Sequence, residues 1–204
     1  TEKAYTITKR PIGITIEDKN VSFGSKIVGL TANVTSGSLV NSDKIEEIIS
    51  LSLPIGFTEE SEVNVYTISG TLINNNYEAV ITPGLYKVDK RDIEVTIMNT
   101  YSYYGDEANT LSYFVSSGGL PNFHKIEDIT LIECDVNPLF SVGKYDINAQ
   151  CINSNYNITF LNTNGSYTVN PRNITVKIDN VSSVYGEVLT QLSCKVIGGK
   201  LVNN

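Results

Sequence analysis

Few residues in this chain have the types and spacing that catalysis requires. The 204-residue sequence contains one histidine, His124, together with three cysteines and 22 acidic residues. A serine–histidine–acid triad would need that histidine, yet the GxSxG turn that presents the serine of many hydrolases does not occur in the sequence. We therefore expect His124 to lie at the surface and to have no catalytic role.

Three short acidic groups have side chains that could bind calcium: Glu59–Glu60–Glu62, Asp106–Glu107 and Glu127–Asp128. None of them has the alternating oxygen ligands of an EF-hand loop. We interpret them as solvated surface and expect no metal and no cofactor. A carboxylate pair for glycoside hydrolysis depends on distance in space, so the sequence alone does not exclude one.

The cysteines, Cys134, Cys151 and Cys194, form no CxxC pair and no Cys/His ligand spacing. Cys151 and Cys194 fall at positions that are apolar elsewhere in the chain, so buried thiols are the first expectation. A disulfide between Cys134 and Cys151 is the alternative, and it would suit an oxidising exterior.

Charge and composition exclude several classes of partner. The net charge is −7 and no basic stripe is present, so we expect neither nucleic acid nor an anionic membrane as a partner. No apolar run approaches the roughly 20 residues that a bilayer requires, so membrane insertion of this segment is not expected. Asn, Ser, Thr, Val, Ile and Tyr are plentiful, which favours strands and turns over helices.

The sequence repeats itself at a constant spacing. Gly105 follows Gly24 by 81 positions (105 − 24), and Gly186 follows Gly105 by the same number (186 − 105), a spacing that we call the repeat interval. The residue before each glycine is aromatic: Phe23, Tyr104 and Tyr185. Other markers keep this interval: Tyr5, Tyr86 and Tyr167; Arg10, Arg91 and Arg172; Leu30, Leu111 and Leu192; Leu39, Leu120 and Leu201. One register held at so many positions indicates an internal repeat.

The repeat predicts the domain organisation. We expect a preceding repeat or linker to end within residues 1–4, a first repeat over 5–85, a second over 86–166 and a partial third over 167–204. Later blocks of the first two repeats lie slightly closer together, as in Tyr77 and Tyr156 (156 − 77 = 79). A half domain cannot bury its apolar strands. We therefore expect the chain to come from a longer array, or its last part to be completed by another chain.

Apolar residues alternate along the first strand expected in each repeat. The inward sets are Ile12, Ile14 and Ile16; Ile93, Val95 and Ile97; Ile174, Val176 and Ile178. This period of two is typical of a strand with one buried face. A second strand follows in each copy, and its inward positions include Ala32, Tyr113 and Cys194. Glycine after the aromatic residue predicts a turn with positive φ, and the aromatic ring is expected to cover one end of the core.

The blocks "KIEEI" (Lys44 to Ile48) and "KIEDI" (Lys125 to Ile129) predict one short helix per unit, capped at Asn41, Ser42 or Asp43 in the first. "YKVDKR" and "YTVNPR" then connect the last strand of one unit directly to the first strand of the next. No Gly/Ser-rich linker intervenes, so a stiff array of mainly β domains is expected.

The pattern resembles the MBG repeats of YGX type, which occur in tandem on long bacterial surface proteins. The resemblance rests on Tyr104–Gly105, Gly118–Gly119–Leu120, "VGKYDI", "NYNITF" and "GSYTVNPRNITV". The first repeat departs from it, because Phe23 replaces the tyrosine and "EVNVYTI" lacks the glycine before its tyrosine. The resemblance implies tandem β-grasp-like domains in an extracellular, cell-surface location and brings no catalytic residues. Ig-like β-sandwich repeats are the alternative fold.

The expected function is a structural or adhesive stalk segment of a long surface or fibre protein. Its partners would be neighbouring repeats of the same chain, with homotypic fibre assembly by strand addition or a surface glycan or host receptor as further partners. The alternative function is a glycan- or host-protein-binding module, in which Tyr77 and Tyr156 would contact sugar from exposed turns. An enzyme is not expected, since an active site is not normally duplicated in successive repeats.

Overall fold

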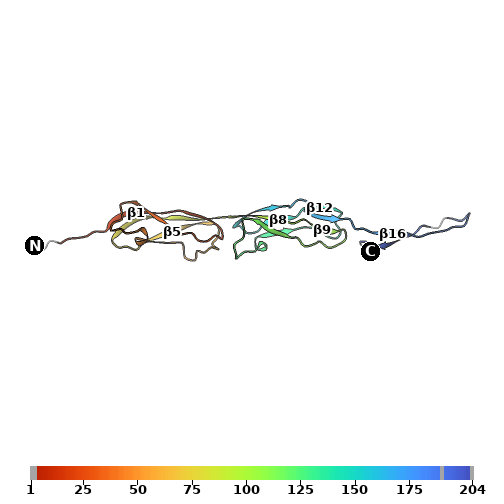
Figure 1. Ribbon diagram of the computed structural model, residues 1–204, viewed down its shortest axis with the longest axis horizontal. Coiled ribbons are helices and arrows are strands. Elements are labelled where there is room, and N and C mark those ends of the chain that lie inside the picture. The colour runs from red at the N-terminus through yellow and green to blue at the C-terminus, as the bar shows by residue number, and fades with distance from the viewer. Residues whose placement is uncertain (1–3, 189–190, 203–204) are drawn as a thin grey trace. The chain divides into compact units, whose positions relative to one another are not determined.

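The computed structural model describes residues 4–188 and 191–202. Within these ranges the secondary structure consists of β-strands and two short 3₁₀ helices, without an α-helix (Figure 1). The prediction of a mainly β fold with one short helix in each of the first two repeats is therefore confirmed. Among the described residues, there is also no helix with the length and apolarity needed to cross a membrane.

The strands fall into three groups along the chain, and the first two groups end a few residues beyond the predicted repeat boundaries, because β7 crosses the boundary at 85/86 and β15 lies in the predicted third repeat. The first group is β1 (Arg10–Ile16), β2 (Lys19–Ser22), β3 (Ala32–Ser36), β4 (Ile49–Ser52), β5 (Asn64–Leu72), β6 (Tyr77–Thr82) and β7 (Gly84–Asp89), with 3₁₀ helix η1 (Ile45–Glu47). The second is β8 (Arg91–Ile97), β9 (Thr100–Tyr103), β10 (Tyr113–Ser117), β11 (Thr130–Glu133), β12 (Gly143–Tyr145), β13 (Asn148–Cys151), β14 (Tyr156–Leu161) and β15 (Tyr167–Asn170), with η2 (Ile126–Asp128). The third is β16 (Thr175–Ile178) and β17 (Cys194–Gly198).

The described chain forms two compact units. Unit 1 contains residues 4–93, Gly118–Ile129 and Cys151–Ile158. Unit 2 contains Glu94–Ser117, Thr130–Gln150 and the described residues from 159 onward. Three segments of the predicted second repeat (86–93, 118–129 and 151–158) thus belong to unit 1, and the repeat boundaries remain a prediction from sequence. Of residues 1–4, only Ala4 is described.

The sheets are mixed. β1 pairs with β3 antiparallel and with β6 parallel, while β7 pairs with β2 parallel and with β5 antiparallel. In the second group β15 likewise pairs with β9 parallel and with β12 antiparallel. An immunoglobulin-type sandwich consists of two antiparallel sheets. The parallel pairs therefore differ from that alternative, and the described residues form several small mixed sheets.

The first strand of each copy pairs antiparallel with a later strand, β1 with β3, β8 with β10 and β16 with β17, and we call each such pair a hairpin although β2 and β9 intervene in the first two. The pairing register of the first hairpin recurs along the chain. Corresponding partners are Ile14 with Val34, Val95 with Val115, and Val176 with Val196. Each pair follows the previous one by one repeat interval, and each hairpin carries a register shift next to this pair. Because a slip of one residue would turn every side chain to the opposite face of the sheet, a shared register places equivalent residues on equivalent faces.

A glycine with positive φ follows the shifted segment in each of these strand pairs. Gly37, Gly118 and Gly199, which again follow the repeat interval, have φ values of 74°, 86° and 80°. A Cβ atom on Gly118 would lie 2.2 Å from the carbonyl oxygen of Asp92, far inside contact distance. Any other residue there would combine an unfavourable backbone conformation with a clash against the backbone.

The core confirms the alternating pattern in the first two repeats and corrects it in the third. Ile14 and Val95 are fully buried, as are their inward neighbours on β1 and β8. Ile174, Val176 and Ile178 were expected to face inward as well, but their side chains are 45%, 47% and 67% exposed. The hairpin has formed there, whereas the described residues supply no second sheet to cover its apolar face.

The short helices lie where "KIEEI" and "KIEDI" predict them, but the caps differ from the expectation. The N–H of Lys44 donates to the Glu47 carboxylate at 3.0 Å, and the N–H of Lys125 donates to Asp128 at 2.8 Å. Capping therefore comes from the acidic third position of each turn, while Asp43 accepts a hydrogen bond from Tyr77.

Candidate functional site

The aromatic–glycine turn has the predicted backbone conformation in all three copies. Gly24, Gly105 and Gly186 have φ values of 72°, 83° and 89°. Phe23 is buried and Tyr104 packs against the core of unit 2, as expected of rings that cover one end of a core. Tyr185 was assigned the same role, but its side chain is fully exposed in the partial third repeat.

An arginine binds the carbonyl group of this turn in two places. Nε of Arg91 donates to the carbonyl oxygen of Phe23 at 2.8 Å, and Nε of Arg172 donates to that of Tyr104 at 2.7 Å. Both arginines are half-buried. Arg91 also donates to the carbonyl oxygen of Gly118 at 3.3 Å. Each arginine lies near the start of one predicted repeat and binds the turn of the predicted repeat before it. We call this contact the arginine clamp.

In unit 1 the turn is surrounded by aromatic rings from residues far along the chain. The ring centroid of Phe23 lies 5.9 Å from Phe123, 5.8 Å from His124 and 5.5 Å from Tyr156. Such edge and stacked contacts add to the free energy gained from burial. These four residues form a packed cluster, which we call the Phe23 cluster, and a Cβ atom on Gly24 would collide with the neighbouring Pro121.

His124 takes part in this cluster as a packing residue. It was expected at the surface, yet it is half-buried, and its Nδ1 lies 2.6 Å from the Tyr156 hydroxyl. The equivalent pair in the first repeat is Tyr77 and Asp43, whose hydroxyl and carboxylate are also 2.6 Å apart. Burial raises the pKa of Tyr156, whereas the hydrogen bond to Asp43 is the main cause that raises the pKa of Tyr77. Both contacts anchor the hydroxyl group of a buried tyrosine.

The structure corrects the prediction that Tyr77 and Tyr156 contact glycans. Both side chains are almost completely buried, at 1% and 2% exposure. A tyrosine ring must be accessible to stack on a sugar, so neither residue can do so in this conformation. Tyr77 is the first residue of β6 and Tyr156 is the first residue of β14, and both side chains face the core.

The cysteines also differ from the expectation. Cys151 and Cys194 are exposed and Cys134 is half-buried, so they are not the buried thiols that strand alternation predicted. All three thiols are free, and the alternative disulfide between Cys134 and Cys151 is not formed. Cys194 is exposed for the same reason as Val176, since its strand lies in the uncovered hairpin.

The acidic groups lie at the surface, as predicted. Glu59, Glu60 and Glu62 are exposed, and so are Glu107 and Glu127. Asp106 forms an ion pair with Arg172, and Asp128 caps η2. Within the described ranges, no three His, Cys, Asp or Glu side chains come together in a way that could hold a metal ion.

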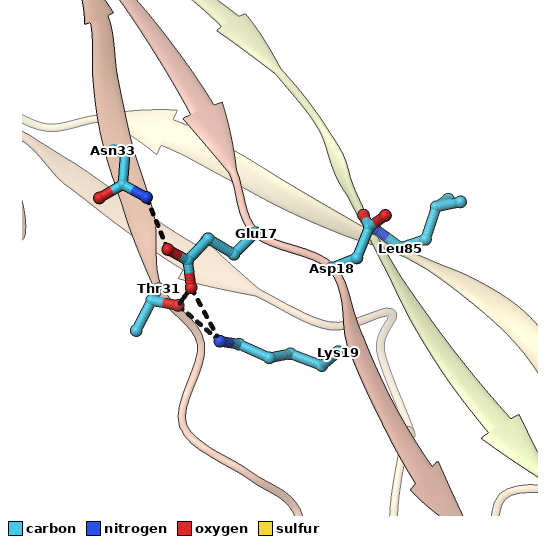
Figure 2. A network of polar contacts seen from close by, with 6 residues as sticks. All are labelled: Glu17, Asp18, Lys19, Thr31, Asn33 and Leu85. Atoms are coloured by element: carbon cyan, nitrogen blue, oxygen red, sulfur yellow. Dashed lines mark hydrogen bonds and ion pairs between the residues drawn. The ribbon is translucent and has the colours of Figure 1, made fainter.

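The most developed polar network surrounds Glu17, a residue that the sequence did not single out. Figure 2 shows its carboxylate between Asn33 and the pair formed by Thr31 and Lys19. Asn33 Nδ2 and Thr31 Oγ1 each donate to it at 2.5 Å, and Lys19 Nζ lies 3.1 Å away. These bonds, with the one from Thr31 contributing most, lower the pKa of Glu17 to about 2. The carboxylate is therefore ionised at neutral pH and accepts hydrogen bonds from three side chains.

This network borders a groove of about 600 Å³ in unit 1. The groove is lined by Glu17, Leu30, Thr31, Ala32, Asn33, Ile45, Glu46, Ile49 and Leu51. Its sides come from β3 and β4, which are both edge strands of their sheets. The groove offers apolar surface with a few fixed polar groups, a combination that can hold a ligand.

The Glu17 network is not a constant part of the repeat. One repeat interval further on, the equivalent positions hold Met98, Ser112 and Phe114, which offer no charge. In the third copy the charge returns, because the Ser193 hydroxyl donates to the Asp179 carboxylate at 3.1 Å and Lys195 lies 3.6 Å from it. The pattern that could have revealed the network is this acid–hydroxyl pair at positions 17 and 31, repeated at 179 and 193.

Comparisons of the chain with family models, with curated proteins and with solved structures found no match. The described residues offer recurring structural contacts, the arginine clamp and the aromatic–glycine turn, together with a groove beside the Glu17 carboxylate.

Proposed function

We propose that the chain is a structural and adhesive segment of a long extracellular surface or fibre protein. It acts as a stiff stalk of tandem β domains, without a catalytic role. This proposal includes the resemblance to MBG repeats of YGX type and a location at the cell surface. The observation that carries it is the arginine clamp, which occurs at two places with the same atoms and nearly the same distance.

The clamp supports a stalk because it holds an arginine near the start of one predicted repeat on a turn of the predicted repeat before it, and both partners of each clamp lie within one compact unit. β7 ends at Asp89 and β8 begins at Arg91, so one residue separates the two strands. A connection this short, combined with a charge-assisted hydrogen bond, resists bending far better than a flexible linker. Repeats that contact only their neighbours are also the general architecture of extended arrays.

Spin labels can measure the stiffness. With the native cysteines replaced by serine, labels at the exposed positions Val80 and Leu139 report a distribution of distances. We expect a narrow distribution in the parent chain and a clearly broader one in Arg91→Ala. Arg10→Ala is the matched control, since the guanidinium group of Arg10 donates to Ser38 of its own predicted repeat, and it should leave the width unchanged. A broad distribution in the parent chain would contradict the stalk.

The location is tested separately. Antibodies raised against this chain should label intact cells of its source, and external protease should remove the label. Labelling that requires permeabilised cells would contradict the surface location, whatever the stiffness of the chain.

The groove beside Glu17 favours the second candidate, a glycan- or host-protein-binding module. Tyr77 and Tyr156 are buried, so this groove is the place at which we test such binding. A glycan array probed with the parent chain and with Leu51→Asp, which places a charge on an apolar wall of the groove, tests this candidate. Binding that the substitution abolishes would support recognition, and the absence of reproducible binding would remove this candidate.

A further inference from the structure

The groove beside Glu17 lies where the first copy of the repeat lacks a side chain that the second copy has. Ala32 lines the groove and pairs with Ile16. Tyr113, one repeat interval later (113 − 32 = 81), pairs with Ile97 in the same register. The second copy therefore has a phenol ring at the position where the first copy has a single methyl group.

The Tyr113 ring is part of the packing of unit 2. Together with Leu111 and Ile132, it packs against the buried core cluster of that unit. The residues equivalent to these two are Leu30 (111 − 81) and Leu51 (132 − 81), and both of them line the groove. The first copy thus keeps the apolar residues at these two positions, and the ring is missing.

The groove has the size and lining that an aromatic ring requires. Its volume is about 600 Å³. Leu30, Ile45 and Leu51 are half-buried, so they form apolar walls that are partly shielded from water. A preformed apolar space lined by aliphatic side chains can bind a small aromatic ring. The groove therefore matches the group that fills the equivalent position in the second copy.

The charged residues that line the groove are both acidic. Glu17 and Glu46 belong to the lining, which includes no lysine or arginine. Lys19 lies 3.1 Å from the Glu17 carboxylate and compensates for its charge. Glu46 is exposed and takes part in none of the ion pairs among the described residues. A ligand with positive charge next to its ring would therefore be attracted to the groove.

We propose that this groove binds the tyrosine side chain of a partner protein that carries basic residues next to that tyrosine. The ring enters beside Ala32, as Tyr113 does in unit 2, and the basic residues lie near Glu46. The edge strands β3 and β4 form the sides of the groove, and an edge strand offers backbone groups to an extended segment of protein. This inference rests on the second candidate function and narrows its partner to a protein, while the stalk function does not depend on it.

The ring site is tested on the whole chain with p-cresol, which is the tyrosine side chain without its backbone. In the isotope-labelled chain, we expect intermolecular nuclear Overhauser effects between the ring protons of millimolar p-cresol and the methyl groups of Leu30 and Leu51. Ala32→Tyr fills the site with the chain's own ring and should abolish these contacts. Val80→Tyr adds the same ring at an exposed position of β6 and should leave them unchanged.

Three blocked tripeptides test the chemistry of the partner. Lys-Tyr-Lys should shift the amide signals of the groove residues and should bind about threefold or more tightly than Glu-Tyr-Glu, because its charge is opposite to that of Glu46. Lys-Ala-Lys lacks the ring and should cause no shift. Glu46→Gln should bring the affinities of the two tyrosine peptides closer together.

Three results would overturn the proposal: no contact of p-cresol with Leu30 or Leu51, contacts that persist in a folded Ala32→Tyr chain, or equal affinities for the two tyrosine peptides. None of these results changes the test of stiffness by spin labels. Glycan binding that Leu51→Asp abolishes, in a chain that binds no ring, would keep the second candidate function and remove the protein partner.

Discussion

Val95 and Val176 occupy the same position in two hairpins of identical register, yet Val95 is fully buried and Val176 is 47% exposed. Both residues face valines of the paired strand, Val115 and Val196. The difference between them therefore comes from what covers the hairpin and not from the hairpin itself. Local sequence determines the register, and packing of a second sheet determines burial.

This matched pair gives the first prediction. Val95→Ala should lower the free energy of unfolding by about 2 kcal/mol or more, because it removes buried methyl groups and leaves a cavity. Val176→Ala should change it by less than about 0.5 kcal/mol, as is usual for exposed positions. Urea denaturation of the two variants measures the difference. Equal losses would show that the third hairpin is covered in solution.

Two adjacent glycines give the second prediction. Gly118 and Gly119 both have positive φ, at 86° and 64°, but the Cβ atom of an alanine would meet the Asp92 carbonyl oxygen only at position 118. Gly119→Ala should cost about 1 kcal/mol of stability, the usual penalty of a left-handed backbone. Gly118→Ala should cost clearly more than this, since it adds a clash with backbone that cannot move away. Thermal unfolding compares the variants, and a similar cost for both would contradict the close approach at the register shift.

The third prediction concerns acid. The pKa of Glu17 falls from 4.5 to about 2 in the folded chain, because Thr31, Lys19 and Asn33 stabilise the carboxylate. A lowered pKa means that the unfolded chain binds the proton more readily. The stabilisation is therefore complete above pH 4.5 and is lost as the pH falls toward 2.

Glu17→Gln should accordingly flatten the dependence of stability on pH between about 4.5 and 2. Glu78→Gln, at an exposed position of β6, is the control for removing one carboxylate. Denaturation midpoints measured across this pH range separate the two variants. A parent-like slope in Glu17→Gln would show that the network does not hold the carboxylate in its charged form.

Much of the fold could be predicted because it depends on local patterns in the sequence. Alternation marked the strands around Ile14 and Val95, and glycine after an aromatic residue marked the turns at Gly24 and Gly105. These features need only the strand period and the conformational freedom of glycine. Because the repeat interval is constant, a strand or turn predicted in one copy is also predicted in the next.

The errors arose where a residue depends on distant parts of the chain. Tyr77 and Tyr156 have polar neighbours in the sequence. Each is nevertheless buried, because its strand pairs with a distant strand of the chain. Cys194 alternates like a core residue, but nothing in the described chain covers it. His124 was expected to be exposed because no sequence pattern reveals that Phe23, far earlier in the chain, packs against it.

The Glu17 network was missed for a related reason. Its donors, Thr31 and Asn33, lie on or next to the strand that pairs with β1, so the contact depends on register and not on neighbours in sequence. Because the second copy replaces the acid with Met98, comparison of the first two repeats gave no signal. Only the third copy, with Asp179 and Ser193, repeats the pair.

Cross-strand nuclear Overhauser effects on the isotope-labelled chain test most directly whether the three segments are copies of one β unit. The backbone signals of Ile14 and Val34, of Val95 and Val115, and of Val176 and Val196 should show the same pattern of contacts, each one repeat interval after the last. A register displaced by even one residue in any of the three hairpins would contradict the account.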